Sequence, residues 1–176
     1  MSKESLELLE PCAELEAEFS AYCGEFAPEG HIPGNNCMAA AGSFMAGVRN
    51  CRDYARGVNL PEGWVPAHSF WLVRDRRTII GTIDLRHSLT PYLEAQGGHV
   101  GYSVRPGERG NGYATRMLEG VLKKAGELGL RRVLITCDKD NIASARVIQK
   151  CGGVLQDEVP SAQRGRQLTQ RYWIAI

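Results

Sequence analysis

The clearest alternation of apolar and polar positions falls within residues 113–128. Apolar side chains recur there every three or four residues, with charged side chains between them, which predicts an amphipathic helix. Just before it, Val100, Tyr102 and Val104 alternate with smaller residues, as in a half-buried strand. The segment 98–128 therefore predicts a strand, a glycine-rich turn and a helix in succession.

A nearly continuous apolar run at residues 132–137 predicts a strand that is covered on both faces. With the strand and helix before it, this run completes a β-α-β unit, so the two strands are expected to be parallel. The predicted class is α/β or α+β, with a mixed central sheet and helices on both faces, in a single domain over residues 1–176. The other expected elements are helices at 11–26, 37–56 and 142–150, strands at 1–10, 69–74, 78–86, 154–158 and 167–176, and a loop at 87–97.

The composition bears on which classes of partner the protein could bind. The chain has 176 residues, of which 21 are basic and 20 acidic, for a formal net charge of +1. This balance gives no argument for binding nucleic acid or a membrane surface. No apolar run approaches the roughly 20 residues of a membrane span, and the first ten residues mix acids with apolar side chains. We expect a cytoplasmic protein.

Six cysteines and four histidines are spread along the chain. The cysteines form no CxxC pair, and the histidines share no metal-ligand spacing with them. We therefore expect reduced structural thiols, the usual state inside cells, and no metal site.

Gly110 and Gly112 lie where the amphipathic helix begins. A helix start exposes unpaired N–H groups and carries partial positive charge, so it suits a phosphate or pyrophosphate. A P-loop would need lysine and then serine or threonine after its last glycine, but Tyr113 and Ala114 follow Gly112. A dinucleotide-binding fingerprint is weak, because Thr115 stands where its third glycine or alanine belongs.

A third interpretation rests on a family resemblance. The stretch from Val104 to Arg109-Gly-Asn-Gly112-Tyr-Ala114 resembles the acyl-CoA signature of the GNAT superfamily of N-acetyltransferases. The stretch Asn141-Ile-Ala-Ser144 to Gly152-Gly153 resembles the second motif of that superfamily, in which an asparagine contacts the pantetheine arm. The resemblance covers about residues 70–176 and implies a sheet that is mostly antiparallel, with one central parallel pair.

The resemblance implies an N-acetyltransferase that uses acetyl-CoA and no metal. The acceptor would be a primary amine of a small molecule or peptide, attacking the thioester directly in a ternary complex. The parallel strands are expected to separate just after Val104, leaving backbone groups for the pantetheine arm and an N–H for the thioester oxygen. The expected acetyl-CoA-binding residues are Ser103, Val104, Arg109, Gly110, Asn111, Gly112, Tyr113, Ala114, Thr115, Asn141 and Ser144.

The residues for proton transfer depart from the pattern of the superfamily. Ile148 stands where many members carry a tyrosine that protonates the leaving thiolate. A glutamate base is often found near the position of His99, and histidine can act as a base near neutral pH. The candidate catalytic residues are His99, Tyr102 and Glu94. Arg86 and His87, at a strand end near the usual acceptor pocket, are candidates for binding a carboxylate-bearing acceptor.

Two other functions stay open at this point. The missing tyrosine permits a non-catalytic acyl-CoA sensor, and the glycine turn permits a nucleotide-binding protein. A homodimer is also left open.

Overall fold

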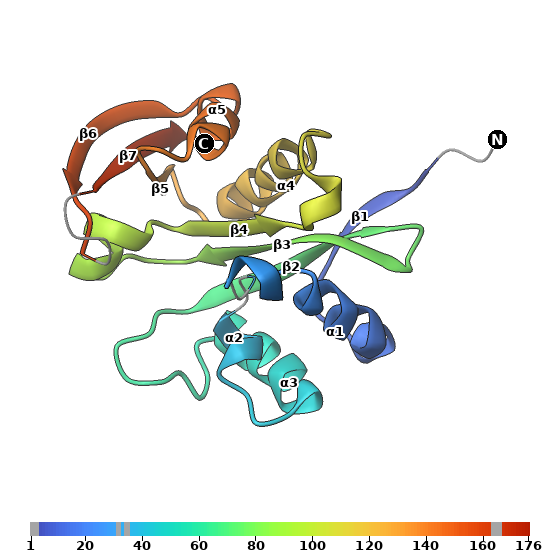
Figure 1. The fold of residues 1–176 in the computed structure, drawn as a ribbon. Helices are drawn as coiled ribbons and strands as arrows, with labels where there is room; N and C mark the ends of the chain where they lie inside the picture. The colour runs from blue at the N-terminus through green and yellow to red at the C-terminus, as the bar shows by residue number, and fades with distance from the viewer. Residues whose placement is uncertain (1–3, 31–32, 34–35, 163–166) are drawn as a thin grey trace.

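The computed structural model describes residues 4–30, 33, 36–162 and 167–176. Its strands form one seven-stranded sheet in the order β1-β2-β3-β4-β5-β7-β6 (Figure 1). β4 and β5 are parallel, and the other neighbours are antiparallel. This arrangement confirms the predicted fold class. The strands are β1 (Leu6–Leu9), β2 (Ala67–Arg74), β3 (Thr78–Arg86), β4 (Val100–Val104), β5 (Arg132–Asp138), β6 (Val154–Pro160) and β7 (Leu168–Ala175).

Helices cover both faces of the sheet. α1 (Glu16–Gly24) and α3 (Phe44–Ala55) pack on one face, and α4 (Tyr113–Glu127) packs on the other (Figure 1). Trp71 on β2 is fully buried in the core beneath α1, whereas its neighbour Leu72 belongs to the core beneath α4. Successive strand residues thus point to opposite faces, as the pleat requires. The remaining helices are α2 (Asn36–Ala39) and α5 (Ile142–Lys150).

Three expected elements differ in the kind or continuity of their structure, and several strands differ by a few residues at their ends. The helix expected at 37–56 is divided into α2 and α3, because the hydroxyl of Ser43 accepts a hydrogen bond from Ala46 N (3.3 Å) and starts a new helix there. The helix expected at 11–26 begins as a 3₁₀ turn, and the loop expected at 87–97 ends in a helical turn over Leu93–Gly97. Residues 1–3 of the expected first strand lie outside the described part.

Cys37 and Cys51 form a disulfide between α2 and α3. The expectation of reduced thiols is therefore wrong for this pair, while Cys12, Cys23, Cys137 and Cys151 are free. The two cysteines are 14 residues apart, and packing of α2 on α3 brings their Cα atoms to 5.1 Å. The spacing of these two cysteines matches no CxxC-type motif, so the sequence alone does not predict their disulfide.

The parallel pair separates earlier than expected. Its register contains one residue pair, Val100 opposite Ile135, so the strands part after Val100 and not after Val104. Just before this pair, the backbone of Gly98 lies close to the backbone of Leu134 on β5. Only glycine fits there, because φ is +62° and a Cβ would lie 2.6 Å from the carbonyl oxygen of Leu134.

The described residues contain no helix long and apolar enough to cross a membrane. Within the same part of the chain, no group of three or more His, Cys, Asp or Glu side chains could hold a metal ion.

Candidate functional site

Two cavities meet at the middle of the sheet. The larger, which we call the groove, has a volume of about 990 Å³ and runs from the gap between β4 and β5 to the start of α4 and to α5. The smaller, which we call the pocket, has a volume of about 480 Å³ and is lined by β2, β3 and residues 90–97. Tyr92, Gln96 and Gly97 line both cavities, so the two are adjacent.

The glycine turn forms one end of the groove. Gly110 and Gly112 have φ values of +82° and +81°, a conformation that favours glycine. Gly112 is the N-cap residue of α4, whose first turn carries no acidic side chain. A Cβ at either glycine would meet no atom within 4 Å, so the backbone here faces open space. The turn can therefore present N–H groups and the positive end of α4 to an anion.

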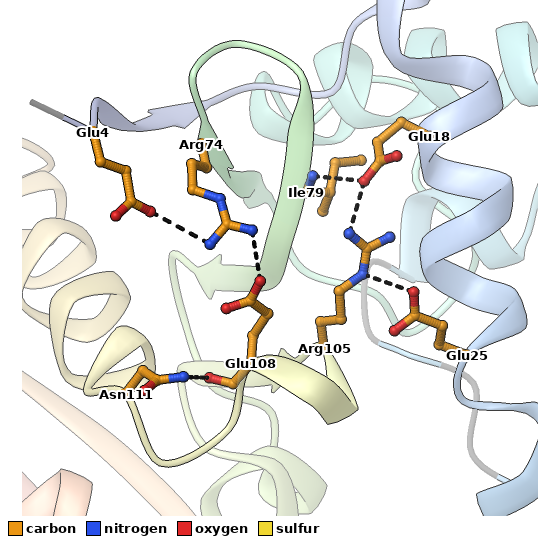
Figure 2. A network of polar contacts seen from close by, with 8 residues as sticks. All are labelled: Glu4, Glu18, Glu25, Arg74, Ile79, Arg105, Glu108 and Asn111. Atoms are coloured by element: carbon orange, nitrogen blue, oxygen red, sulfur yellow. Dashed lines mark hydrogen bonds and ion pairs between the residues drawn. The ribbon is translucent and has the colours of Figure 1, made fainter. Parts of the chain in front are cut away.

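Arg105 fastens the beginning of this turn to α1. Its guanidinium lies 2.9 Å from Glu18 and 3.2 Å from Glu25, and its side chain is about one-tenth exposed (Figure 2). Glu18 also accepts a hydrogen bond from Ile79 N at 2.9 Å, which ties the same carboxylate to β3. The ion pairs thus join the turn, α1 and β3 in one network.

Glu108 fastens the middle of the turn to β2. Arg74 lies 2.6 Å from the Glu108 carboxylate and 3.4 Å from that of Glu4, as Figure 2 shows. The amide of Asn111 donates to the carbonyl oxygen of Glu108 at 3.1 Å. The turn is therefore held in place before any ligand binds, which lowers the entropy that binding must overcome.

The side chain of Arg109 is directed toward α1 and the segment after it. Its guanidinium makes two 2.8 Å hydrogen bonds to Glu29, and its Nε donates to the carbonyl oxygen of Val104 at 3.3 Å. The Glu29 carboxylate raises the pKa of Arg109, whose guanidinium also lies over the ring of Phe26. Arg109 thus stabilises the groove wall through its side chain.

Most residues expected at the acyl-CoA site lie along the groove. Asn111 and Thr115 do not line it, because the Asn111 amide bonds to the turn and Thr115 is a buried residue in the first turn of α4. The expected residues that line the groove are Ser103, Val104, Arg109, Gly110, Gly112, Tyr113, Ala114, Asn141 and Ser144. Phe26, Cys137 and Arg146 line the groove too, although no sequence motif indicated them as ligand-binding residues.

Asn141, Ser144 and Tyr102 meet at the side of the groove formed by α5. Asn141 caps this helix by accepting a hydrogen bond from Ser144 N at 3.1 Å. The Ser144 hydroxyl lies 2.8 Å from the Tyr102 hydroxyl on β4. Burial raises the pKa of Tyr102 to about 12, so its hydroxyl keeps its proton at neutral pH.

His99 and Glu94 line neither cavity. His99 is 5% exposed, and its Nδ1 accepts a hydrogen bond from Leu134 N at 2.9 Å. Burial lowers the pKa of His99 to about 4, so the ring is neutral and helps to join β4 to β5. The side chain of Glu94 is exposed, and its carbonyl oxygen accepts a hydrogen bond from Arg171.

Arg86 and His87 lie at the end of β3 but in different surroundings. Arg86 lines the pocket, and its Nη1 donates to the carbonyl oxygens of Gly97 (3.2 Å) and Gly98 (3.1 Å). His87 lines neither cavity, and its Nε2 lies 2.7 Å from Nδ1 of His68. The structure thus separates the two candidates for binding an acceptor carboxylate.

Asp84 is the pocket residue that the sequence analysis missed. It is 6% exposed, lines the pocket, and accepts a 2.6 Å hydrogen bond from the Ser69 hydroxyl. A signal was present, since this acidic residue interrupts a strand whose flanking residues, Ile83 and Leu85, are fully buried. A charged group inside a buried strand usually has a partner or a function.

The class of protein follows from a mixed sheet that opens between its one parallel pair, with a glycine turn at the mouth of the opening. Residues 17–154 match the family model described as Acetyltransferase (GNAT) domain. The chain belongs to this family of GNAT acetyltransferases.

One relative and several solved structures are similar to the chain. The uncharacterised N-acetyltransferase YnaD of Bacillus subtilis (strain 168) is 27% identical over 110 residues, and the match spans 60% of this chain and 61% of YnaD. The RimL ribosomal L7/L12 alpha-N-protein acetyltransferase in complex with coenzyme A superposes with a TM-score of 0.71 at 16% identity, covering 97% of this chain and 94% of that one.

The microcin C7 self-immunity acetyltransferase MccE, in complex with acetyl-CoA and AMP, has a TM-score of 0.70 at 16% identity over 97% of this chain and 92% of its own. Spermidine N-acetyltransferase from Vibrio cholerae has a TM-score of 0.63 at 15% identity, over 99% of this chain and 95% of that chain. At such identities the likeness shows the fold.

Proposed function

We propose that the chain is an acetyl-CoA-dependent N-acetyltransferase that acts on a primary amine of a small molecule or peptide. The main support is the groove, which joins the gap between β4 and β5 to the glycine turn and to the capped start of α5. These are the surfaces that a thioester, a pyrophosphate and an amide-rich arm would each require.

The glycine turn fits a pyrophosphate. The backbone of Gly110 and Gly112 faces open space, and the N-terminus of α4 adds partial positive charge. Arg146 lines the same groove and supplies a full positive charge. A protein of this design needs no metal to bind the phosphates of acetyl-CoA, because N–H groups and cationic side chains can hold them.

The gap in the sheet fits the arm and the thioester. Beyond Val100 the edge of β4 is no longer paired in register with β5, so an extended arm can lie between them like an added strand. An N–H near Ser103 or Val104 can then hold the thioester oxygen as negative charge develops there. Asn141 lines the same groove, where its amide can contact the arm.

Tyr102 and Ser144 are the proposed proton donors to the leaving thiolate. Ile148 is fully buried in the core and offers no proton, whereas the two hydroxyls face the groove. We propose no proton-transfer role for His99 or Glu94, since both lie away from the groove and the pocket.

Two measurements test the proposal. We expect CoA and acetyl-CoA to raise the melting temperature, while ATP and NAD do not, by the usual linkage of binding to stability. We also expect thiol release from acetyl-CoA in the presence of a panel of primary amines. Protection by CoA without turnover on any amine would instead indicate the acyl-CoA sensor. Protection by ATP or NAD, but not by CoA, would overturn the proposal.

A further inference from the structure

The pocket beside the groove has aromatic walls. Tyr54, Trp64 and Tyr92 line it, and the rings of Tyr54 and Trp64 meet edge to face with centroids 5.7 Å apart. A volume of about 480 Å³ suits a small organic molecule rather than a folded partner. Because Tyr92 also lines the groove, a molecule in the pocket would lie next to whatever occupies the groove.

The charged side chains among the described residues lining the pocket are Asp84 and Arg86. The Nη1 of Arg86 already donates to two carbonyl oxygens, at Gly97 and Gly98, and this fixes the guanidinium against the segment before β4. Asp84 accepts a hydrogen bond from the Ser69 hydroxyl, which orients the carboxylate. The acidic group is therefore held in a defined position at the base of the pocket.

Gly101 connects Asp84 to the groove. The two residues are directly opposite in the β3–β4 register, and opposite residues point to the same face of a sheet. Gly101 lines the groove, and a Cβ placed on it would have the Nη2 of Arg86, at 3.9 Å, as its nearest neighbour. β4 itself therefore contributes no side chain between the carboxylate and the edge of the groove, and the guanidinium of Arg86 is the nearest group there.

We propose that Asp84 binds the nitrogen of the acceptor, and that the pocket selects small organic amines that enter as cations. The inference rests on the proposed N-acetyltransferase function and adds its acceptor class. A carboxylate forms a charge-assisted hydrogen bond to an ammonium group, and aromatic faces attract cations. The sequence offered Arg86 and His87 as candidates for binding a carboxylate-bearing acceptor, and the arrangement around Asp84 points to the opposite charge.

The chemical step follows from this position. The ammonium group first gives one proton to Asp84, which passes it to solvent, because only the neutral amine has the lone pair needed for attack. The nitrogen then attacks the thioester carbon, so that a C–N bond forms and the C–S bond breaks. The nitrogen loses its second proton to Asp84 and from there to solvent, while the leaving thiolate takes a proton from the Ser144–Tyr102 pair or from water. The products are an acetylated amine and CoA, and no further reactant is needed.

The test compares matched probes on wild-type protein saturated with CoA or acetyl-CoA. We expect 2-phenylethylamine to raise the melting temperature of the CoA complex and to be acetylated, while 3-phenylpropionate, of similar shape but opposite charge, does neither. We also expect phenylalaninamide to be a better acceptor than phenylalanine. A preference for 3-phenylpropionate or phenylalanine would overturn the inference and assign the pocket to carboxylates bound by Arg86.

Variants complete the test. Asp84→Asn keeps the acceptor atom for Ser69 but removes the charge, so kcat/KM for 2-phenylethylamine should fall by about 10- to 100-fold while protection by CoA persists. Asp75→Asn, in the β2–β3 turn, is the matched control and should leave kcat/KM unchanged. Equal kcat/KM for Asp84→Asn and wild type would overturn the inference. Failure of CoA to protect wild-type protein would instead overturn the proposed function.

Discussion

The hydroxyl of Tyr102 on β4 lies 2.8 Å from the hydroxyl of Ser144 in the first turn of α5. The residues are 42 positions apart, and both line the groove. The cap at Asn141 holds the backbone of Ser144, so the position of its hydroxyl follows from the helix start. In the proposed function this pair donates the proton that Ile148, at the position of the tyrosine of many family members, cannot supply.

Loss of either hydroxyl should slow the transfer step. We expect Tyr102→Phe and Ser144→Ala each to lower kcat by about 100-fold, at the lower end of what general acid catalysis contributes. The double variant should be little slower than either single one, because both hydroxyls serve one proton path. Thiol release at saturating acetyl-CoA measures this. Tyr172→Phe, which also removes a buried tyrosine hydrogen bond, is the control. Independent, multiplicative losses would contradict a shared path.

Gly112→Asp should abolish binding of CoA. The new carboxylate would bring negative charge into the proposed pyrophosphate site and strain a residue with φ +81°. Gly129→Asp is the matched control, because Gly129 has the same φ of +81°, has open space around it and lies outside the groove. Both variants should lose about 1 to 2 kcal/mol of stability, the usual cost of a side chain in the left-handed conformation. Isothermal titration with CoA separates the two, and unchanged affinity in Gly112→Asp would exclude the site.

Arg105→Met should destabilise the fold. It leaves Glu18 and Glu25, whose side chains are partly exposed, without the guanidinium that now lies 2.9 and 3.2 Å from them, so we expect a loss of about 1 to 2 kcal/mol in the free energy of unfolding. Arg56→Met is the control, because Arg56 pairs with Asp53 at the surface, where ion pairs contribute little. Urea unfolding measures both. A loss equal to that of the control would show that the network in Figure 2 does not hold the turn.

The stability of the protein should fall as the medium becomes acidic. Burial lowers the pKa of His99 to about 4 from an ordinary value near 6.5, so the unfolded chain takes up a proton that the folded chain refuses. The stabilisation is present above pH 6.5 and is lost as the pH falls toward 4, by up to about 3 kcal/mol. Burial also lowers the pKa of His68 and His87, which add in the same direction.

His99→Asn isolates the first of these contributions, since its side-chain oxygen can still accept the hydrogen bond from Leu134 N. Urea unfolding at several pH values between 7 and 4 should give a shallower decline for the variant than for wild type. Parallel curves would show that His99 titrates normally and is not buried as described.

Local patterns in the sequence determined the strands, the helices and the glycine turn. The alternation at Val100–Val104 and the three- and four-residue period of α4 arise because one side of each segment packs against the core. Each pattern lies within consecutive residues, so it can be recognised before any tertiary contact is known. The parallel pair followed from the short helical connection between its strands. The two motifs of the family predicted, for the same local reason, nine of the residues that line the groove.

Only the tertiary structure decided which of the candidate residues meet. Asp84 faces Gly101, Tyr102 faces Ser144, and Cys37 bonds to Cys51 because strands and helices distant in sequence pack together. His99 was a candidate base by its position, yet hydrogen bonds of its backbone N–H and its ring to Leu134 hold it buried where the segment before β4 still contacts β5. The charge and the contacts of a side chain inside a sheet depend on residues of the adjacent strands. The pattern of residues along one strand does not show which residues these are.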